Sequence, residues 1–338
     1  MFSDDSTKKR KKAESSVSDL MPDFDSCLAS GSVTPPPSKE RKEKNPRYET
    51  VSNLPQFVQS PLKTKYYFKK TIGRGNFGRV DEYQSLQGGD RVVKWELSPQ
   101  TVKQKRAPRG YNHVKMLALA AKARRAGLFG YLICNGEGLG RQKCSQPHGI
   151  MMPKIPGEHL DTFFRGKLSE QTLQDSFRTL LKMSIATIDA LSTYHAEVKS
   201  VHCDIKPDNF HIIINKEGLK VHVLDVDSSV DVGEEVDDSE MNRKFCDPEL
   251  LQGGLFIFHR AQYRNDIYSV GRMMEEFLKM HRAKDKSATM RAKHELFEDV
   301  IVGMKRQREK APVAYTFDQA KEKLKEALAA TVLHSFRL

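Results

Sequence analysis

The amino-acid sequence predicts an α+β fold of two lobes, a small antiparallel sheet followed by a mostly helical part, with a cleft between them. Two observations predict this class. Short runs of aromatic and branched residues separated by turns fill residues 66–152, which is typical of strands. After Gly157 the apolar residues recur mainly at helical spacing. We therefore expect a first lobe at about residues 66–152 and a second lobe at about residues 157–335.

Residues 1–60 are predicted to be a disordered tail, which leaves residues 61–338 as the folded domain. The tail holds serine clusters, a TPPPS sequence at residues 34–38 and charges of both signs, with few large apolar residues to bury. Its basic run KKRKK at Lys8–Lys12 is a signal that nuclear import machinery reads, although such runs also arise by chance in solvated tails. We expect a nuclear protein, with the cytoplasm as the alternative.

Several classes are disfavoured by composition. No apolar run approaches the roughly 20 residues that a membrane-spanning helix needs, so no membrane contact is expected. The N-terminus has no apolar stretch after its basic cluster, which argues against a secretory signal. The five cysteines are scattered without metal-ligand spacing, which favours a reduced intracellular protein.

The positive charge is concentrated early in the folded part. The chain carries a net charge of +12, and residues 61–130 alone hold sixteen Lys/Arg against four Asp/Glu. This favours an acidic or phosphorylated partner, or chromatin, at the first lobe. A solvated basic face without a partner is the alternative.

The first-lobe elements are predicted in order along the chain. Residues 112–125 should form a helix, because their apolar side chains fall at i, i+3, i+4 and i+7. The predicted strands are Tyr66–Ile72, Val80–Tyr83, Arg91–Trp95, Tyr131–Cys134 and Gly149–Met152.

The second lobe should begin with a long helix, whose buried stripe is Phe177, Leu181, Ile185, Ile188 and Leu191. A short hairpin follows, and helices return from Asp266 onward. The predicted hairpin strands are Phe210–Ile214 and Val221–Leu224, joined by the turn Asn215–Gly218, and the last helix is Phe317–Ala330.

A glycine-rich stretch, Gly73–Val80, lies between the first two predicted strands. Glycine lets the backbone approach phosphate groups and point N–H groups at them. A dinucleotide-binding fold would need a helix directly after this motif, whereas here a strand follows. The stretch is therefore interpreted as a flap over phosphates, with an ordinary structural hairpin as the alternative.

Lys94 follows in the predicted strand Arg91–Trp95. On a period of two its side chain should point into the cleft, where an ammonium group can hold phosphate oxygens. A surface lysine on an edge strand is the alternative.

The strongest motif is the loop His202–Asn209. Asp204 can accept the proton of an attacking hydroxyl, Lys206 can neutralise a γ-phosphate, and Asn209 can bind Mg²⁺. Asp225, at the end of the second hairpin strand, adds another hard oxygen ligand. Two such ligands and nucleotide phosphates form the partial cage that Mg²⁺ accepts.

The order of these motifs resembles the protein kinase superfamily over about residues 66–330. The resemblance implies a two-lobed kinase fold, ATP and Mg²⁺ as cofactors, and a protein substrate. The motif DIKPDN is similar to the corresponding motif of Ser/Thr kinases, and DIKPDNF is similar to that of casein-kinase-like and mitotic-checkpoint kinases. The resemblance also makes Met152 the gatekeeper, Pro153–Pro156 the adenine-binding hinge, Pro248-Glu249 the end of the activation segment, and Asp266 the aspartate below the catalytic loop.

Site residues follow from the same resemblance. The catalytic residues are Asp204 and Lys206, and the magnesium ligands are Asn209 and Asp225. Those expected to contact the nucleotide are Ile72, Gly73, Arg74, Gly75, Asn76, Phe77, Gly78, Val80, Lys94 and Met152.

Four positions depart from the family pattern. His113 stands where a helix glutamate normally pairs with the lysine, and no acidic residue lies between Glu96 and Glu137, so Glu96 or Asp227 is expected to substitute. Asp227 replaces a glycine. Its carboxylate is interpreted either as a third oxygen ligand of the metal or as a restraint on the activation segment. Cys203 replaces an arginine, which argues against switching by phosphorylation. Asn242 replaces a threonine, which leaves substrate choice open.

The activation segment itself is acidic, with eight Asp/Glu among residues 225–240. We hypothesise that it docks on the basic first lobe in place of a phosphate; a mobile, solvated loop is the alternative. For the whole chain we expect an active Ser/Thr protein kinase. The alternatives are a pseudokinase that binds nucleotide or serves as a scaffold, and a small-molecule phosphotransferase of related fold.

Overall fold

The computed structural model describes residues 56–60, 62–74, 78–96, 121–122, 131–134, 137–138, 148–216, 218–236, 242–248, 260–285, 290–305 and 315–333. These residues belong to one unit that runs from Glu49 to Leu338. Several predictions fall outside them: the tail up to residue 55, Gly75 to Phe77, His113 and most of its predicted helix, Glu249, and acidic residues 237, 238 and 240.

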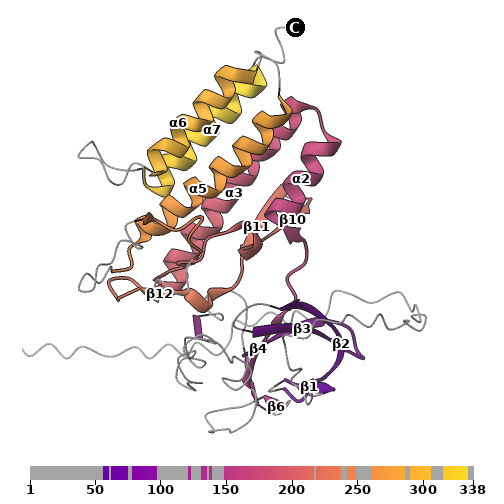
Figure 1. The fold of residues 1–338 in the computed structure, drawn as a ribbon. Coiled ribbons are helices and arrows are strands. Elements are labelled where there is room, and N and C mark those ends of the chain that lie inside the picture. The colour runs from indigo at the N-terminus through magenta and orange to yellow at the C-terminus, as the bar shows by residue number, and fades with distance from the viewer. Residues whose placement is uncertain are drawn as a thin grey trace, which may run out of the picture. The chain divides into compact units, whose positions relative to one another are not determined.

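Seven described strands of the first lobe form a closed barrel (Figure 1). They are β1 (Phe57–Gln59), β2 (Lys65–Arg74), β3 (Gly78–Ser85), β4 (Asp90–Glu96), β5 (Tyr131–Cys134), β6 (Glu137–Gly138) and β7 (His148–Pro153). Their order is β1-β2-β3-β4-β7-β5-β6, and neighbours are antiparallel. The exception is the parallel pair β1–β6, which joins Gln59 to Glu137 and closes the barrel.

Alternate residues of these strands fill a small core. It consists of Val58, Tyr66, Tyr83, Val93, Trp95 and Met151. Successive side chains of a strand point to opposite faces, so Lys94, between Val93 and Trp95, lies on the outer face of the barrel. The period of two that was predicted for this strand is therefore observed in the structure.

Strand β1 shows that the folded domain starts earlier than the predicted boundary at residue 61. Its residues pair with Tyr67, Tyr66 and Lys65 of β2, and Val58 is fully buried. A strand of three residues is too short to give a periodic signal, so the polar composition around it dominated the prediction.

Replacing Val58 by alanine is expected to lower the free energy of unfolding by about 2 kcal/mol, because buried methyl groups are lost and a cavity remains. The midpoint of urea unfolding measures the loss. Val232 provides the matched control, since its side chain is 48% exposed and its truncation should leave the midpoint nearly unchanged. An unchanged midpoint for Val58→Ala would exclude β1 from the cooperative fold.

The second lobe is built mainly from helices (Figure 1). They are α2 (Leu160–Glu170), α3 (Leu173–Val198), α5 (Tyr263–Lys284), α6 (Arg291–Lys305) and α7 (Phe317–Leu333). Helix α3 begins after Thr172, whose hydroxyl accepts the Asp175 amide at 3.1 Å, and ends at Lys199, which has a left-handed φ of 58°. None of the described helices is long and apolar enough to cross a membrane.

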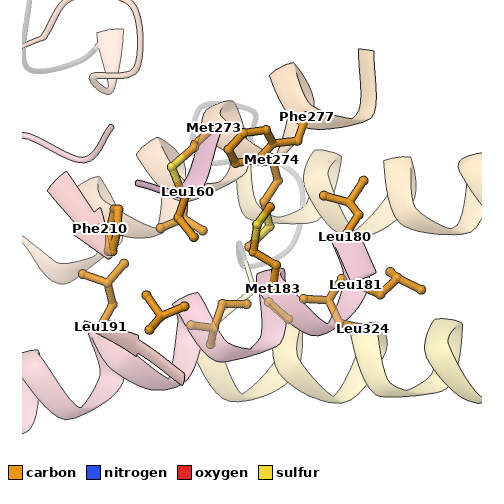
Figure 2. Packing of buried hydrophobic residues seen from close by; sticks show 14 of the residues in the cluster. Leu160, Leu180, Leu181, Met183, Leu191, Phe210, Met273, Met274, Phe277 and Leu324 are labelled. Atoms are coloured by element: carbon orange, nitrogen blue, oxygen red, sulfur yellow. The ribbon is translucent and has the colours of Figure 1, made fainter. Parts of the chain in front are cut away.

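Helix α3 lies at the centre of the main core, where it contacts α2, α5 and α7. Figure 2 shows Leu180, Leu181 and Met183 of α3 among side chains from these neighbours, including Met274 and Leu324. The predicted apolar stripe belongs to this helix and is buried except at Ile185, which is partly buried. Its burial fixes the lobe that carries the loop His202–Asn209.

Two small sheets complete the second lobe. One contains β8 (Glu158–His159), β10 (Phe210–Asn215) and β11 (Gly218–Val223), and the other contains β9 (Ser200–Val201) and β12 (Val230–Asp231). The two hairpin strands extend further into the predicted turn than expected. Short 3₁₀ turns occur at Pro207–Asn209 and Val226–Ser228. The α+β class with two lobes is confirmed.

Candidate active site

Lys94 lies in a row of residues that crosses the barrel wall. The strand register pairs Gly73 with Val80, Val80 with Lys94, and Lys94 with Ile150. Directly paired residues share one face of a sheet, so Val80 and Lys94 both project outward. Met152, two residues after Ile150 on the same face, packs against the core of the second lobe. This face therefore meets the second lobe.

The hairpin of β2 and β3 carries the glycine-rich turn. Arg74 ends β2 and Gly78 begins β3, so both flank the turn. Ile72 lies at a register irregularity between the pairs Thr71–Asp81 and Gly73–Val80, with its side chain 45% exposed. The described part of the predicted flap is therefore held as a strand pair.

Asp81 braces this hairpin, a role that sequence analysis missed. The buried carboxylate accepts hydrogen bonds from Thr71 Oγ1 at 2.8 Å and from Arg79 Nε and Nη2 at 3.0 and 2.6 Å. Such bonds offset the cost of burying a charge. The only sequence signal was an acidic residue at an inward position of a strand.

The chain leaves the first lobe through residues 153–156 and turns at Gly157, which has a φ of 99°. A Cβ atom there would collide with the carbonyl oxygen of Ile212 in β10. Only glycine satisfies both constraints without displacing the backbone. The predicted hinge is thus fixed against the strand that follows the catalytic loop.

The loop His202–Asn209, for which a catalytic role is predicted, is anchored by Asp266 of α5, which is fully buried. Its carboxylate accepts hydrogen bonds from the backbone N–H groups of His202 at 2.7 Å and Cys203 at 3.1 Å, and His195 Nε2 lies 2.8 Å away. These contacts hold Cys203 at a φ of 64°, which residues other than glycine seldom adopt. The backbone is thus fixed directly before Asp204.

Lys206 and Asn209 converge on Asp204. Lys206 Nζ lies 2.5 Å from Asp204 Oδ2, and Asn209 Nδ2 donates to the Asp204 carbonyl oxygen at 2.7 Å and to Oδ2 at 2.9 Å. Within the described part of the chain the other carboxylate oxygen, Oδ1, is buried and has no hydrogen-bond partner. It is therefore available to accept a hydrogen bond from a substrate hydroxyl.

The pairing of β10 with β11 brings Asn209 beside the strand end that precedes Asp225. Phe210 pairs with Val223, and the N–H of Leu224 donates to the Asn209 carbonyl at 2.8 Å. Two residues that are distant in sequence thus become neighbours.

His202 links the loop to the same strand end. Its Nδ1 accepts the Asp204 N–H at 3.3 Å, and its Nε2 lies 2.9 Å from the Leu224 carbonyl oxygen. Since a carbonyl can only accept, the proton of the ring lies on Nε2. Sequence analysis gave His202 no role, and only its place in the motif hinted at one.

Lys94 joins the two lobes electrostatically. Its Nζ atom lies 2.5 Å from Asp225 Oδ1 and 2.6 Å from Asp227 Oδ2. Burial alone would lower the pKa of Lys94, but the Asp227 and Asp225 carboxylates outweigh it and hold the pKa above its ordinary value. Burial would likewise raise the pKa of Asp225, yet Lys94 outweighs it and holds that pKa low. Both groups are therefore charged near neutral pH.

The donor set fits a magnesium ion together with phosphates. Both hydrogens of the Asn209 amide are directed at Asp204, which leaves its Oδ1 oxygen as a ligand, and Asp225 is an ionised carboxylate. The described residues contain no group of three or more His, Cys, Asp or Glu side chains that could hold a metal by themselves. Phosphate oxygens would complete the coordination, as Mg²⁺ sites commonly require.

The activation segment contacts the first lobe at Lys122. Its Nζ atom donates to the Ser229 carbonyl at 2.9 Å and lies 3.1 Å from Asp231 Oδ1. Ser229 also bonds Tyr194 through its hydroxyl at 2.6 Å, and Ser200 donates to Asp231 at 2.5 Å. Asp231 therefore contacts a first-lobe lysine, as Asp225 and Asp227 of the same acidic segment do at Lys94, while Glu234 and Glu235 are exposed.

Two of the departures from the family pattern have clear structural settings. Cys203 is buried, and burial together with the nearby Asp266 carboxylate raises the pKa of its thiol, so the group is neutral. Asn242 accepts the Lys244 N–H at 3.1 Å and caps a turn. Cys203 therefore does not supply the positive charge of the arginine in the family pattern, and Asn242 does not supply the hydroxyl of the threonine.

Comparison with protein-family models matches residues 66–334 to the protein kinase domain. The match covers most of the chain, which therefore belongs to the protein kinase family. The family implies phosphate transfer and a protein as the substrate.

Proposed function

We propose that the chain is an active kinase that transfers the γ-phosphate of ATP to serine or threonine hydroxyl groups of proteins. One observation carries the proposal. Lys206 and Asn209 both bind Asp204 Oδ2, while Oδ1 is buried without a partner among the described residues. This arrangement supports a preorganised acceptor for a hydroxyl proton.

The outer face of the barrel supplies the nucleotide contacts in this proposal. The glycine-rich turn covers the phosphates, Lys94 holds their oxygens, and Val80 and Met152 lie on the face that receives the base. Asn209 Oδ1 and Asp225 would hold Mg²⁺, which when bound neutralises phosphate charge.

The chemical step requires one proton acceptor and one cation beside the substrate. The substrate oxygen forms a bond to the γ-phosphorus while the bond from phosphorus to the ADP oxygen breaks. Asp204 orients the hydroxyl and accepts its proton, and Lys206 offsets the charge on the transferred group. Lys206, two residues after Asp204 in the DIKPDN sequence, supports Ser/Thr over tyrosine as acceptor.

The proposal is tested with the full chain and ATP labelled in the γ-phosphate. We expect label in the protein itself and in a generic basic substrate with Mg²⁺, and none with EDTA. Acid hydrolysis should release phosphoserine or phosphothreonine. Asp225→Asn, purified in the same way, should remain unlabelled, which excludes a contaminating kinase.

The alternative is a pseudokinase, favoured by the replacement of a glycine by Asp227 and of an arginine by Cys203. It predicts that ATP raises the melting temperature while no label is incorporated. If label is found only in phosphotyrosine, the chain is an active kinase and the assignment to serine or threonine is rejected.

A further inference from the structure

Lys94 contacts two carboxylates, and only one of them belongs to the proposed magnesium site. Asp227 Oδ2 lies 2.6 Å from Lys94 Nζ, as close as the 2.5 Å of Asp225 Oδ1. The side chains of Lys94 and Asp227 are 20% and 34% exposed, so solvent only partly screens their attraction. The ammonium has three hydrogens, and these two contacts leave one for a phosphate oxygen.

The sequence has His113 at the position where a glutamate normally supplies a carboxylate to this lysine. Residues 97–136 contain no Asp or Glu, so nothing in that stretch can offset the charge of Lys94. Among the described acids of the first lobe, Asp81 binds Arg79, while Glu82 and Asp90 pair with lysines elsewhere on the sheet. Glu96 and Glu137 are the other acids in the described first-lobe strands, and Glu96 is the nearer competitor in sequence, two residues beyond Lys94 in β4.

The backbone on both sides of Asp227 is held in place. Val226 is buried in the second-lobe core, and its carbonyl accepts the Ser229 N–H at 3.1 Å. Ser229 is fixed in turn by Tyr194 and Lys122. Asp227 therefore presents its carboxylate to Lys94 from a short, anchored 3₁₀ turn.

We propose that Asp227 is the positioning residue of Lys94, supplying from the second lobe the counter-charge that residues 97–136 lack. Asp225 is then free to act as a metal ligand, since Lys94 retains a carboxylate of its own. The inference rests on the proposed function for its catalytic meaning, whereas the ion pair itself does not.

A double-mutant cycle tests the pair without metal or nucleotide. Asp227→Asn is expected to lower the melting temperature of the wild type by about 2–4 °C, the shift that corresponds to roughly 1 kcal/mol. In a Lys94→Met background the same change should raise the melting temperature, because it removes one of two adjacent negative charges. Equal shifts in both backgrounds would overturn the pairing.

Glu96→Gln is the matched comparison, since it neutralises the competing acid. We expect its shift to be the same in both backgrounds. If Glu96→Gln, and not Asp227→Asn, shows the dependence on Lys94, the counter-charge belongs to Glu96 and the proposal fails.

Kinetics give the second readout. Asp227→Asn should raise KM for ATP and lower kcat about 10-fold or more, because Lys94 is misplaced, while the dependence of the rate on Mg²⁺ concentration stays as in the wild type. If the melting-temperature shifts are additive and the rate of Asp227→Asn responds less to Mg²⁺ than the wild-type rate, Asp227 is a metal ligand and the proposal is overturned. If the double-mutant cycle shows coupling but the wild-type chain transfers no phosphate, the ion pair between Lys94 and Asp227 stands and the proposed function is rejected.

Discussion

Replacing Asp204 by asparagine is expected to reduce phosphate transfer about 10³-fold, within the range for loss of a general base, and to leave ATP affinity nearly unchanged. Lys206 and Asn209 both donate to Oδ2, so the oxygen of the new amide will turn toward them. The amide nitrogen then takes the position of the unpartnered Oδ1. A donor at that position cannot accept the proton of a substrate hydroxyl.

Asp208→Asn is the matched control, because Asp208 lies in the same loop but is exposed. Its transfer rate should stay within about 2-fold of the wild type, as expected for a solvated surface position. Single-turnover rates measure the chemical step, and nucleotide titration measures affinity. Should Asp204→Asn keep more than a tenth of the rate, Asp204 would not be the proton acceptor.

Replacing Asp266 by asparagine is expected to have the largest effect on stability, lowering the free energy of unfolding by about 3 kcal/mol. The carboxylate accepts hydrogen bonds from two backbone N–H groups, and His195 Nε2 lies beside it. An amide has one accepting oxygen, so at least one buried N–H faces another donor. Release of the strained Cys203 backbone should then displace Asp204 and reduce transfer as well.

Asp161→Asn serves as the control for this change. Asp161 forms a surface pair with Arg165 at 3.8 Å, and such pairs contribute little. Urea unfolding measures stability, and phosphate transfer below the unfolding transition measures the displaced loop. A stable Asp266→Asn protein with full activity would show that the loop is held by other contacts.

The sequence predicted that Asp204, Lys206 and Asn209 point to one place, and the structure brings them together. Asp204, Lys206 and Asn209 lie within six positions, so their spacing alone brings them together. The alternation of side chains along the strand of Lys94 was also predictable, since it depends only on neighbouring residues. The contact between Lys94 and Asp225 needed the fold, because 131 positions separate the two residues.

Other features had no usable sequence signal. Lys122 is one of several similar basic residues, and nothing local distinguishes the one that reaches Asp231. The pairing of basic residues with Glu82 had no such signal either. Lys69 and Lys154 lie 2.9 and 3.1 Å from the buried Glu82 carboxylate, which offsets part of their charge.

The closed barrel limits how another protein can bind the first lobe. Every strand of the barrel, as far as it is described, has a neighbour on each side. Recognition by β-augmentation needs an edge strand with free backbone N–H and C=O groups, and β1 occupies that edge of β2 at Lys65–Tyr67. Side chains offer another means of recognition here. The exposed aromatic residues of β1 and β2 are Phe57, Tyr67 and Phe68, at 41%, 42% and 39% exposure, and the rings of Phe57 and Tyr67 are tilted with their centroids 6.3 Å apart.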